Sequence, residues 1–132
     1  MAVVVVAEDD DDLRAIAVRL LSRGGHRVTA APNGAEALRL VGEERPDVVV
    51  SDIDMPVMSG VDLCLAIRAD PALRELPVVF ISGSLVPGDD RPVRAQATTM
   101  LRKPFTAQEL LGCVEKALHS GHQPGQEPFD CP

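Results

Sequence analysis

The 132-residue sequence lacks long apolar runs and an excess of basic residues, and each lack excludes a class of protein. It has 20 acidic and 13 basic residues, and the formal net charge of −7 does not suit a surface that binds nucleic-acid phosphates. No apolar stretch reaches the roughly 18 residues of a membrane span, and no basic segment with a cleavage site accompanies the first apolar run. We therefore expect a cytoplasmic protein of one domain, without nucleic-acid or membrane partners.

Cysteine is also scarce, with Cys64, Cys113 and Cys131 as the three examples. Their number is odd and their spacing is not typical of a zinc site, so we expect neither a disulfide framework nor a bound metal at these thiols. We expect reduced thiols, with Cys64 as a small residue of the core.

Five short segments rich in β-branched residues are predicted to be strands, and helical patterns separate them. The expected strands are 2–7, 27–31, 48–50, 77–82 and 99–102. The expected helices are 13–23, 35–43, 59–69 and a last helix that follows Thr106. Between 83 and 99 the residues Pro87, Gly88 and Pro92 allow only a short helix near 93–96, so we predict a mobile loop there. We predict that the domain covers residues 1–120 and that 121–132 form a disordered tail.

Polar side chains follow four of these strands where each strand ends. Alternation of strands and helices predicts a doubly wound parallel sheet, whose strands end at one common edge. Glu8 and Asp9, Asp52, Ser82 and Lys103 would all lie at that edge. An acidic residue after a strand can merely open a turn or cap a helix, and we assign residues 10–12 to capping. Four polar strand ends together point instead to a binding site.

The acidic residues of this edge predict a cation site. Two carboxylates about 5 Å apart repel by roughly 3 kcal/mol at an effective dielectric constant near 20, so Glu8, Asp9 and Asp52 in one cleft require a positive charge. Oxygen ligands suit Mg²⁺, which prefers octahedral geometry.

In this order and spacing, these residues resemble the receiver domain of bacterial response regulators. The resemblance runs from Val3 to Leu118 and includes Met55-Pro56 and Gly60 after Asp52 and the triplet Lys103-Pro104-Phe105. It implies an α/β fold of the flavodoxin-like kind, a doubly wound five-stranded parallel sheet of order 2-1-3-4-5, here with an irregular fourth helix.

The resemblance also implies roles for individual residues. Asp52 would be the phosphoacceptor, and Glu8 and Asp9 would be the acidic pair around Mg²⁺. Asp52 would attack phosphorus as the nucleophile, while Ser82 and Lys103 would bind the phosphoryl oxygens. The backbone carbonyl of Asp54 would complete the protein ligands of the metal. By the same resemblance, the peptide bond between Lys103 and Pro104 is predicted to be cis.

The implied function is that of a receiver in a two-component phosphorelay. The chain would take a phosphoryl group from a histidine kinase or phosphotransfer protein onto Asp52 and signal to an unknown downstream protein through a conformational change. It would catalyse only its own phosphorylation and dephosphorylation, so it is not expected to be an enzyme in the usual sense. We expect a monomer or a weak homodimer.

Two departures from the family pattern concern the output of the signal. Met100 stands where the family usually carries an aromatic ring whose rotamer reports phosphorylation, and residues 83–99 replace a full fourth helix. We therefore predict that the signal depends on ordering of the 83–99 loop rather than on a ring flip.

Two alternatives remain open. The sequence Asp52-Ile53-Asp54 after a strand also resembles the opening motif of haloacid-dehalogenase-type phosphatases, although that motif normally opens its domain and would leave Glu8 and Asp9 without a role. A degenerate receiver that acts only as a protein-binding module is the other alternative, and Met100 is the feature that favours it.

Overall fold

Strands and helices alternate along the chain in the computed structural model, which describes residues 1–123 and 125–131. The elements are β1 (Val3–Ala7), α1 (Asp11–Arg23), β2 (Arg27–Ala31), α2 (Gly34–Glu44), β3 (Val48–Asp52), α3 (Gly60–Ala69), β4 (Val78–Ser82), α4 (Arg91–Ala95), β5 (Thr99–Arg102), α5 (Ala107–Ser120) and β6 (Phe129–Asp130). Every strand and long helix predicted from the sequence is present.

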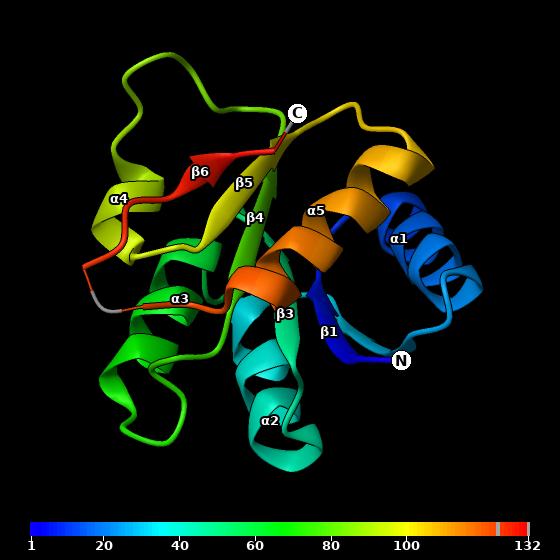
Figure 1. Cartoon of the computed structure of the whole chain (residues 1–132), viewed down its shortest axis with the longest axis horizontal. Coiled ribbons are helices and arrows are strands. Elements are labelled where there is room, and N and C mark those ends of the chain that lie inside the picture. Colours follow the sequence, from blue (N-terminus) through cyan, green and yellow to red (C-terminus); the bar gives the residue numbers. More distant parts are fainter. Residues whose placement is uncertain (124, 132) are drawn as a thin grey trace.

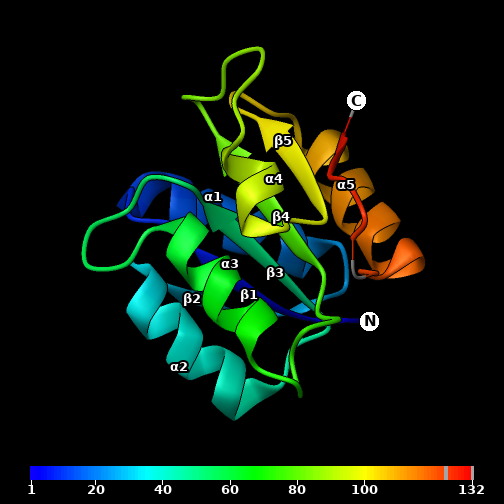
Figure 2. The same ribbon diagram turned by 90° about the vertical axis from the view of Figure 1, so that its left-hand side faces the viewer.

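A single sheet runs through the molecule, with strand order β2-β1-β3-β4-β5-β6 and parallel pairing throughout. Its first five strands have the predicted order 2-1-3-4-5, so the flavodoxin-like architecture is confirmed. Helices α2, α3 and α4 cover one face and α1 and α5 cover the other (Figure 1). In Figure 2, helices α2, α3 and α4 lie nearer the viewer than the sheet.

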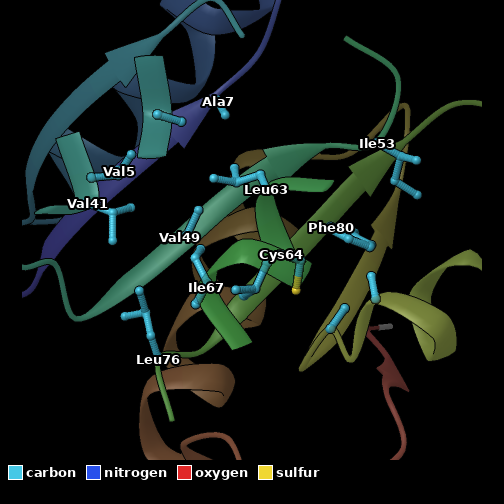
Figure 3. Packing of buried hydrophobic residues seen from close by; sticks show 14 of the residues in the cluster. Val5, Ala7, Val41, Val49, Ile53, Leu63, Cys64, Ile67, Leu76 and Phe80 are labelled. Atoms are coloured by element: carbon cyan, nitrogen blue, oxygen red, sulfur yellow. The ribbon is translucent and has the colours of Figure 1, made fainter. Parts of the chain in front are cut away.

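Each central strand is buried on both faces because successive side chains point to opposite sides. Val5 and Val49 pack with Leu63 and Ile67 of α3 on one face, as Figure 3 shows. Val4 and Val50 belong to the second cluster, which includes residues of α1 and α5. Two hydrophobic layers therefore hold the central strands and keep their carboxyl ends in register.

The helices begin at the capping residues that the sequence indicates. The side chains of Asp10, Asn33, Ser59 and Thr106 each accept a hydrogen bond from a backbone N–H in the first turn. Thr106 and Glu109 form the complete capping box. These caps satisfy backbone donors at the helix starts, which explains why the boundaries follow the local sequence.

The end of the chain differs from the prediction of a disordered tail. After Gly121, whose φ is 65°, the chain turns back and its residues 129 and 130 add β6 beside β5. The N–H of Cys131 donates to the carbonyl oxygen of Met100 at 3.0 Å, and the Lys116 ammonium lies 4.7 Å from the centre of the Phe129 ring. Backbone pairing and this cation–π contact order a segment whose proline and glycine content predicts disorder. Residues 124 and 132 of the predicted tail lie outside the described residues.

The prediction of three reduced thiols is also wrong. Cys113 on α5 and Cys131 after β6 form a disulfide across 18 residues of sequence, with their Cα atoms 5.6 Å apart. The return of the chain along β5 brings these two residues together, and sequence spacing does not reveal that path. Cys64 is free and buried in the core, as predicted.

Helix α4 is short, which agrees with the irregular fourth helix expected from the prolines. Lys103-Pro104 is cis, as predicted. Within the described part of the chain, no helix has the length and apolar character needed to cross a bilayer.

Candidate functional site

Three carboxylates meet where β1 and β3 end. The two strands lie side by side with Ala7 opposite Ser51, so Glu8 and Asp52 emerge at the same edge of the sheet. One oxygen each of Glu8, Asp9 and Asp52 lies within 4.8 Å of the others. Glu8 and Asp52 are buried and Asp9 is exposed, so the cluster opens to solvent on the side of Asp9.

Asp52 is held in one orientation by the backbone that follows it. Its Oδ1 accepts a hydrogen bond from the N–H of Ile53 at 2.8 Å, while Oδ2 lies 3.3 Å from Lys103 Nζ. The hydroxyl of Ser51 donates to the Asp52 carbonyl oxygen at 2.8 Å. Oδ1 is therefore bound to the backbone, whereas Oδ2 faces the Lys103 ammonium.

Lys103 bridges two of the acidic residues. Its Nζ lies 2.9 Å from Glu8 Oε1 and 3.3 Å from Asp52 Oδ2. Burial lowers the pKa of Lys103, but the carboxylates of Glu8 and Asp52 outweigh burial and the pKa is raised overall. The N–H of Lys103 also donates to the Ser82 carbonyl oxygen at 2.9 Å, which joins the ends of β4 and β5. Lys103 is therefore a fixed cation inside the acidic cleft.

The acidic cluster carries more negative charge than Lys103 alone compensates. Burial and, to a lesser extent, the charge of Asp52 raise the pKa of Glu8 to about 7, against the hydrogen bonds from Lys103 and from the N–H of Asp10. A carboxyl so disfavoured as an anion indicates that further positive charge would stabilise the site. Three oxygen donors within 4.8 Å match the ligand preference of a small divalent cation such as Mg²⁺.

Ser82 supplies a buried hydroxyl at the end of β4, the strand beside β3. Its Oγ accepts a hydrogen bond from the N–H of Ser84 at 3.0 Å and lies 3.0 Å from Ser84 Oγ. The hydroxyl of Ser84 in turn donates to Asp54 Oδ2 at 2.6 Å. In this state the Ser82 hydroxyl is therefore engaged with its own loop.

The side chain of Asp54 forms contacts that the sequence does not predict. The carboxylate is 62% exposed and contacts Ser84 and Arg91, whose Nη1 lies 3.1 Å from Asp54 Oδ1. The side-chain oxygens that gather near one another at the acidic cluster come from Glu8, Asp9 and Asp52. The role of the Asp54 backbone carbonyl in metal binding stays a prediction.

Arg91, at the start of α4, connects the loop after β4 to the site. Besides Asp54, its guanidinium donates to Ser84 Oγ at 3.1 Å and to Asp89 Oδ2 at 2.8 Å. The hydrogen bond from Arg91 lowers the pKa of Asp89 to about 2. Residues 83–90 thus have specific contacts in this structure, contrary to the expectation of a loop with few. The 37 residues between Asp54 and Arg91 explain why local sequence patterns missed the pair.

Two glycines permit the close approach of chain segments around the site. A Cβ at Gly60 would lie 2.1 Å from the carbonyl oxygen of Asp52, and one at Gly34 would lie 2.5 Å from that of Met58. Both contacts are too short for any side chain. Glycine at these positions lets α2 and α3 begin directly against the end of β3 and the loop that follows it.

An apolar cavity of about 400 Å³ lies next to Lys103. It is lined by Leu13, Ile16, Lys103, Pro104 and Phe105. Ile16 of α1 has a relative exposure of 43%. The site therefore has an accessible apolar surface at its rim, formed by α1 and the segment between β5 and α5.

A parallel sheet of this order, with an acidic triad, a buried hydroxyl and a lysine at the ends of its strands, has the fold and the site residues of a receiver domain. The sequence matches the response regulator receiver domain over residues 4–115, and the chain belongs to this family.

Known proteins of several kinds resemble the chain. It is 37% identical over 119 residues to the response regulator receiver protein CpdR of Brucella abortus, covering 87% of this chain and 95% of that one. It is 42% identical over 118 residues to the transcriptional regulatory protein PrrA of Mycobacterium tuberculosis, covering 87% of this chain but only 49% of PrrA. Among solved structures, the receiver domain of the sensor histidine kinase PA1611 from Pseudomonas aeruginosa, with a magnesium ion coordinated in its active site cleft, has a TM-score of 0.82 and 26% identity, covering 89% of this chain and 98% of that one.

Proposed function

We propose that the chain accepts a phosphoryl group on Asp52 from a histidine kinase or phosphotransfer protein, in a reaction that depends on Mg²⁺. The observation that carries the proposal is the position of Lys103 Nζ, within 3.3 Å of both Asp52 Oδ2 and Glu8 Oε1. A cation at this point serves an oxyanion that arrives at Asp52, because it is already desolvated and held in place. The family of the chain supports the same role.

The residues of the site suit each step of this transfer. Asp52 Oδ2 attacks phosphorus, a new P–O bond forms to the carboxylate, and the bond to the donor breaks in line with it. Lys103 is placed to bind one phosphoryl oxygen, and Ser82 can bind another when its hydroxyl leaves Ser84. Glu8, Asp9, Asp52 and the carbonyl of Asp54 would hold Mg²⁺, which would compensate the charge that accumulates on the phosphoryl oxygens.

The chemistry of the transfer indicates how often the chain can react, where it acts and where its donor docks. The chain would catalyse only its own phosphorylation and dephosphorylation, since Asp52 is consumed and must be regenerated for each cycle. A kinase donor draws on ATP, so we place the chain in the cytoplasm. The apolar surface formed by the exposed Ile16 and the half-buried Phe105 suits docking of the phosphodonor protein, because it adjoins Lys103. The downstream protein is unassigned.

Labelling with a small phosphodonor tests the proposal. Wild-type protein incubated with acetyl phosphate and Mg²⁺ should acquire one hydroxylamine-labile phosphoryl group, and Asp52→Asn should acquire none. Asp62→Asn, which removes a carboxylate from the first turn of α3, is the matched control and should label normally. Undiminished labelling of the Asp52→Asn protein would refute the assignment.

A phosphatase of the haloacid-dehalogenase type remains the alternative enzyme. The position of Asp52 at the end of the third strand, with Lys103 between it and Glu8, favours the receiver. Multiple turnover of a phosphate ester by catalytic amounts of protein would favour the phosphatase. A degenerate receiver that acts only as a binding module would fail to label under any of these conditions.

A further inference from the structure

A polar cavity lies near the end of the sheet that is opposite the acidic cluster. It has a volume of about 190 Å³ and is lined by Arg68, Arg74, Gln96 and His122. These residues come from four places: the end of α3, the segment before β4, the end of α4 and the segment that follows α5. They gather near the start of β4 and β5, whereas Asp52 and Lys103 lie beyond the opposite ends of the strands.

Arg68 brings a positive charge to this cavity, and no carboxylate of the described residues forms an ion pair with it. Its Nε donates to the Gln96 carbonyl at 2.9 Å, and its Nη1 donates to the carbonyls of Leu76 at 2.7 Å and Arg74 at 3.1 Å. Its Nη2 is buried and has no hydrogen-bond partner in the part of the chain that the structure describes. Among the described residues the ion pairs include none with Arg68 or Arg74, so only carbonyl dipoles oppose this charge.

His122 adds a second buried donor. The residue is only 5% exposed, and its Nδ1 lies 2.9 Å from Thr98 Oγ1, which accepts a hydrogen bond from the N–H of Val78 at 3.0 Å. The described structure offers the Thr98 hydroxyl proton no other acceptor than Nδ1, so the ring proton of a neutral His122 sits on Nε2. Among residues 1–123 and 125–131, Nε2 is buried and has no hydrogen-bond partner.

The two side chains repel each other when both are charged. Burial, and after it the charge of Arg68, lower the pKa of His122 to about 4. His122 is thus a neutral N–H donor near neutral pH, facing a cationic guanidinium. The nearby acidic residues Asp70 and Glu75 line a different cavity, with Val41, Arg45 and Leu76 among others.

Buried donors without acceptors are uncommon in folded proteins, and two in one charged cavity indicate a missing acceptor. A water molecule could accept one hydrogen bond but would leave the charge uncompensated. We propose that this cavity binds a small phosphate-type oxyanion, held by Arg68 Nη2, His122 Nε2 and the Arg74 guanidinium. A phosphate group has several acceptor oxygens and up to two negative charges, and a volume of about 190 Å³ has room for it.

Binding at this cavity would connect α3, α4 and the segment after α5 through one ligand. It would also change the protonation of His122, because an adjacent anion favours the imidazolium. The site is independent of Asp52 phosphorylation, and its occupancy would report the level of free phosphate or of a phosphate ester.

The experiment is a titration of the full chain with inorganic phosphate, followed through the imidazole C–H signals in NMR spectra. The signals of His122 should shift and saturate, and its pKa should rise by one unit or more at saturation. Those of His26 and His119 are internal references. The Arg74→Gln variant should bind at least fivefold more weakly, whereas Arg19→Gln, which removes an exposed arginine of α1, should bind as the wild type does.

Separate arms exclude the acidic cluster and identify the source of the anion. In the Lys103→Gln variant the His122 response should persist, because Lys103 lies at the other end of the sheet. Glycerol phosphate that binds more tightly than inorganic phosphate would point to a phosphomonoester, and weaker binding to the free ion. An unresponsive His122, a response lost with Lys103, or equal affinity in the Arg74→Gln and wild-type proteins would overturn the proposal.

Discussion

At the scale of single residues, the site contains two linked sets of contacts. In the first set, the Lys103 ammonium forms ion pairs with Glu8 and Asp52. In the second set, Ser84 contacts the hydroxyl of Ser82 and the carboxylate of Asp54, and Arg91 contacts both Ser84 and Asp54. The Ser82 hydroxyl proton cannot be donated to Ser84 Oγ and to a phosphoryl oxygen on Asp52 at the same time. Phosphorylation would therefore break one of the contacts that hold residues 83–90, and the ordering of this loop by phosphate stays a prediction.

We predict that Arg91→Gln loosens this loop. The substitution removes the ion pairs with Asp54 and Asp89, so local opening of the loop should become several-fold more frequent. Amide hydrogen exchange in residues 83–90 measures this. Arg94→Gln removes an exposed pair with Asp90 on the same helix and serves as the control. Equal protection of the loop in the Arg91→Gln and wild-type proteins would contradict the prediction.

At the scale of elements, the approach of helices to strand ends shapes the site. Helix α3 starts at Gly60, whose N–H donates to the Ile53 carbonyl at 2.8 Å, so the loop that carries Asp54 is short and tightly closed. Strand β6 pairs with β5 at the edge of the sheet that is farthest from β2, and the Cys113–Cys131 disulfide links the end of the chain to α5. An edge strand that is already paired offers fewer free backbone groups to another chain.

Gly60→Ala should destabilise the protein by at least about 2 kcal/mol, because the new methyl group would meet the backbone of Asp52 and force α3 away from β3. Denaturant unfolding measures the loss, and labelling by acetyl phosphate should also slow as Asp52 shifts. Gly112→Ala on α5, where no atom lies within 4 Å of an added Cβ, is the matched control. Alanine there should be neutral or stabilise by up to about 1 kcal/mol. Similar stabilities for the two variants would show that the close approach at Gly60 is unimportant.

At the scale of the whole molecule, stability depends on charges buried at the two ends of the sheet. The acidic cluster at one end carries excess negative charge, and the Arg68–His122 cavity at the other carries excess positive charge. Ligands of opposite sign should therefore stabilise the fold from either end, by linkage to the native state.

Mg²⁺ is predicted to raise the melting temperature of the wild-type protein. The ion relieves repulsion among Glu8, Asp9 and Asp52, and saturation at one hundred times its dissociation constant would add about 2.7 kcal/mol. Asp9→Asn should melt at a higher temperature than the wild type in metal-free buffer, because one charge is gone, and should respond little to Mg²⁺. Differential scanning calorimetry checks both points. A full response in the Asp9→Asn protein would place the ion elsewhere.

The pH dependence of stability is predicted to carry the signature of His122. Its pKa is about 4 in the fold and 6.5 in the unfolded chain, so its contribution is complete above pH 6.5 and is lost as pH falls toward 4, up to about 3 kcal/mol. Glu8 has the opposite effect on the pH dependence of stability in metal-free buffer. Its pKa is about 7 in the fold, above the ordinary 4.5, so its contribution to stability is complete below pH 4.5 and is lost as pH rises toward 7.

Comparison with His122→Gln isolates the histidine, since both proteins share Glu8. Chemical denaturation at several pH values, in buffer without phosphate or sulfate, should show the wild type losing its advantage over the variant between pH 6.5 and 4. A constant difference over this range would mean that His122 does not change its protonation on unfolding.

Local patterns in the sequence determined most of the fold and the ends of its strands. Apolar runs that are buried on both faces predict parallel strands, capping residues mark where helices begin, and the polar residues after each strand meet because parallel strands end together. Glu8, Asp9, Asp52, Ser82 and Lys103 could be grouped for that reason before any coordinates were known.

Only the tertiary structure decided the pairings between distant segments. Arg91 meets Asp54 across 37 residues, and Cys131 meets Cys113 because the chain turns back after Gly121 along β5. His122 faces Arg68 for the same reason, at a cavity to which four separate segments contribute. Such contacts depend on the path of the whole chain, and neither the periodicity nor the composition of any one segment contains that path.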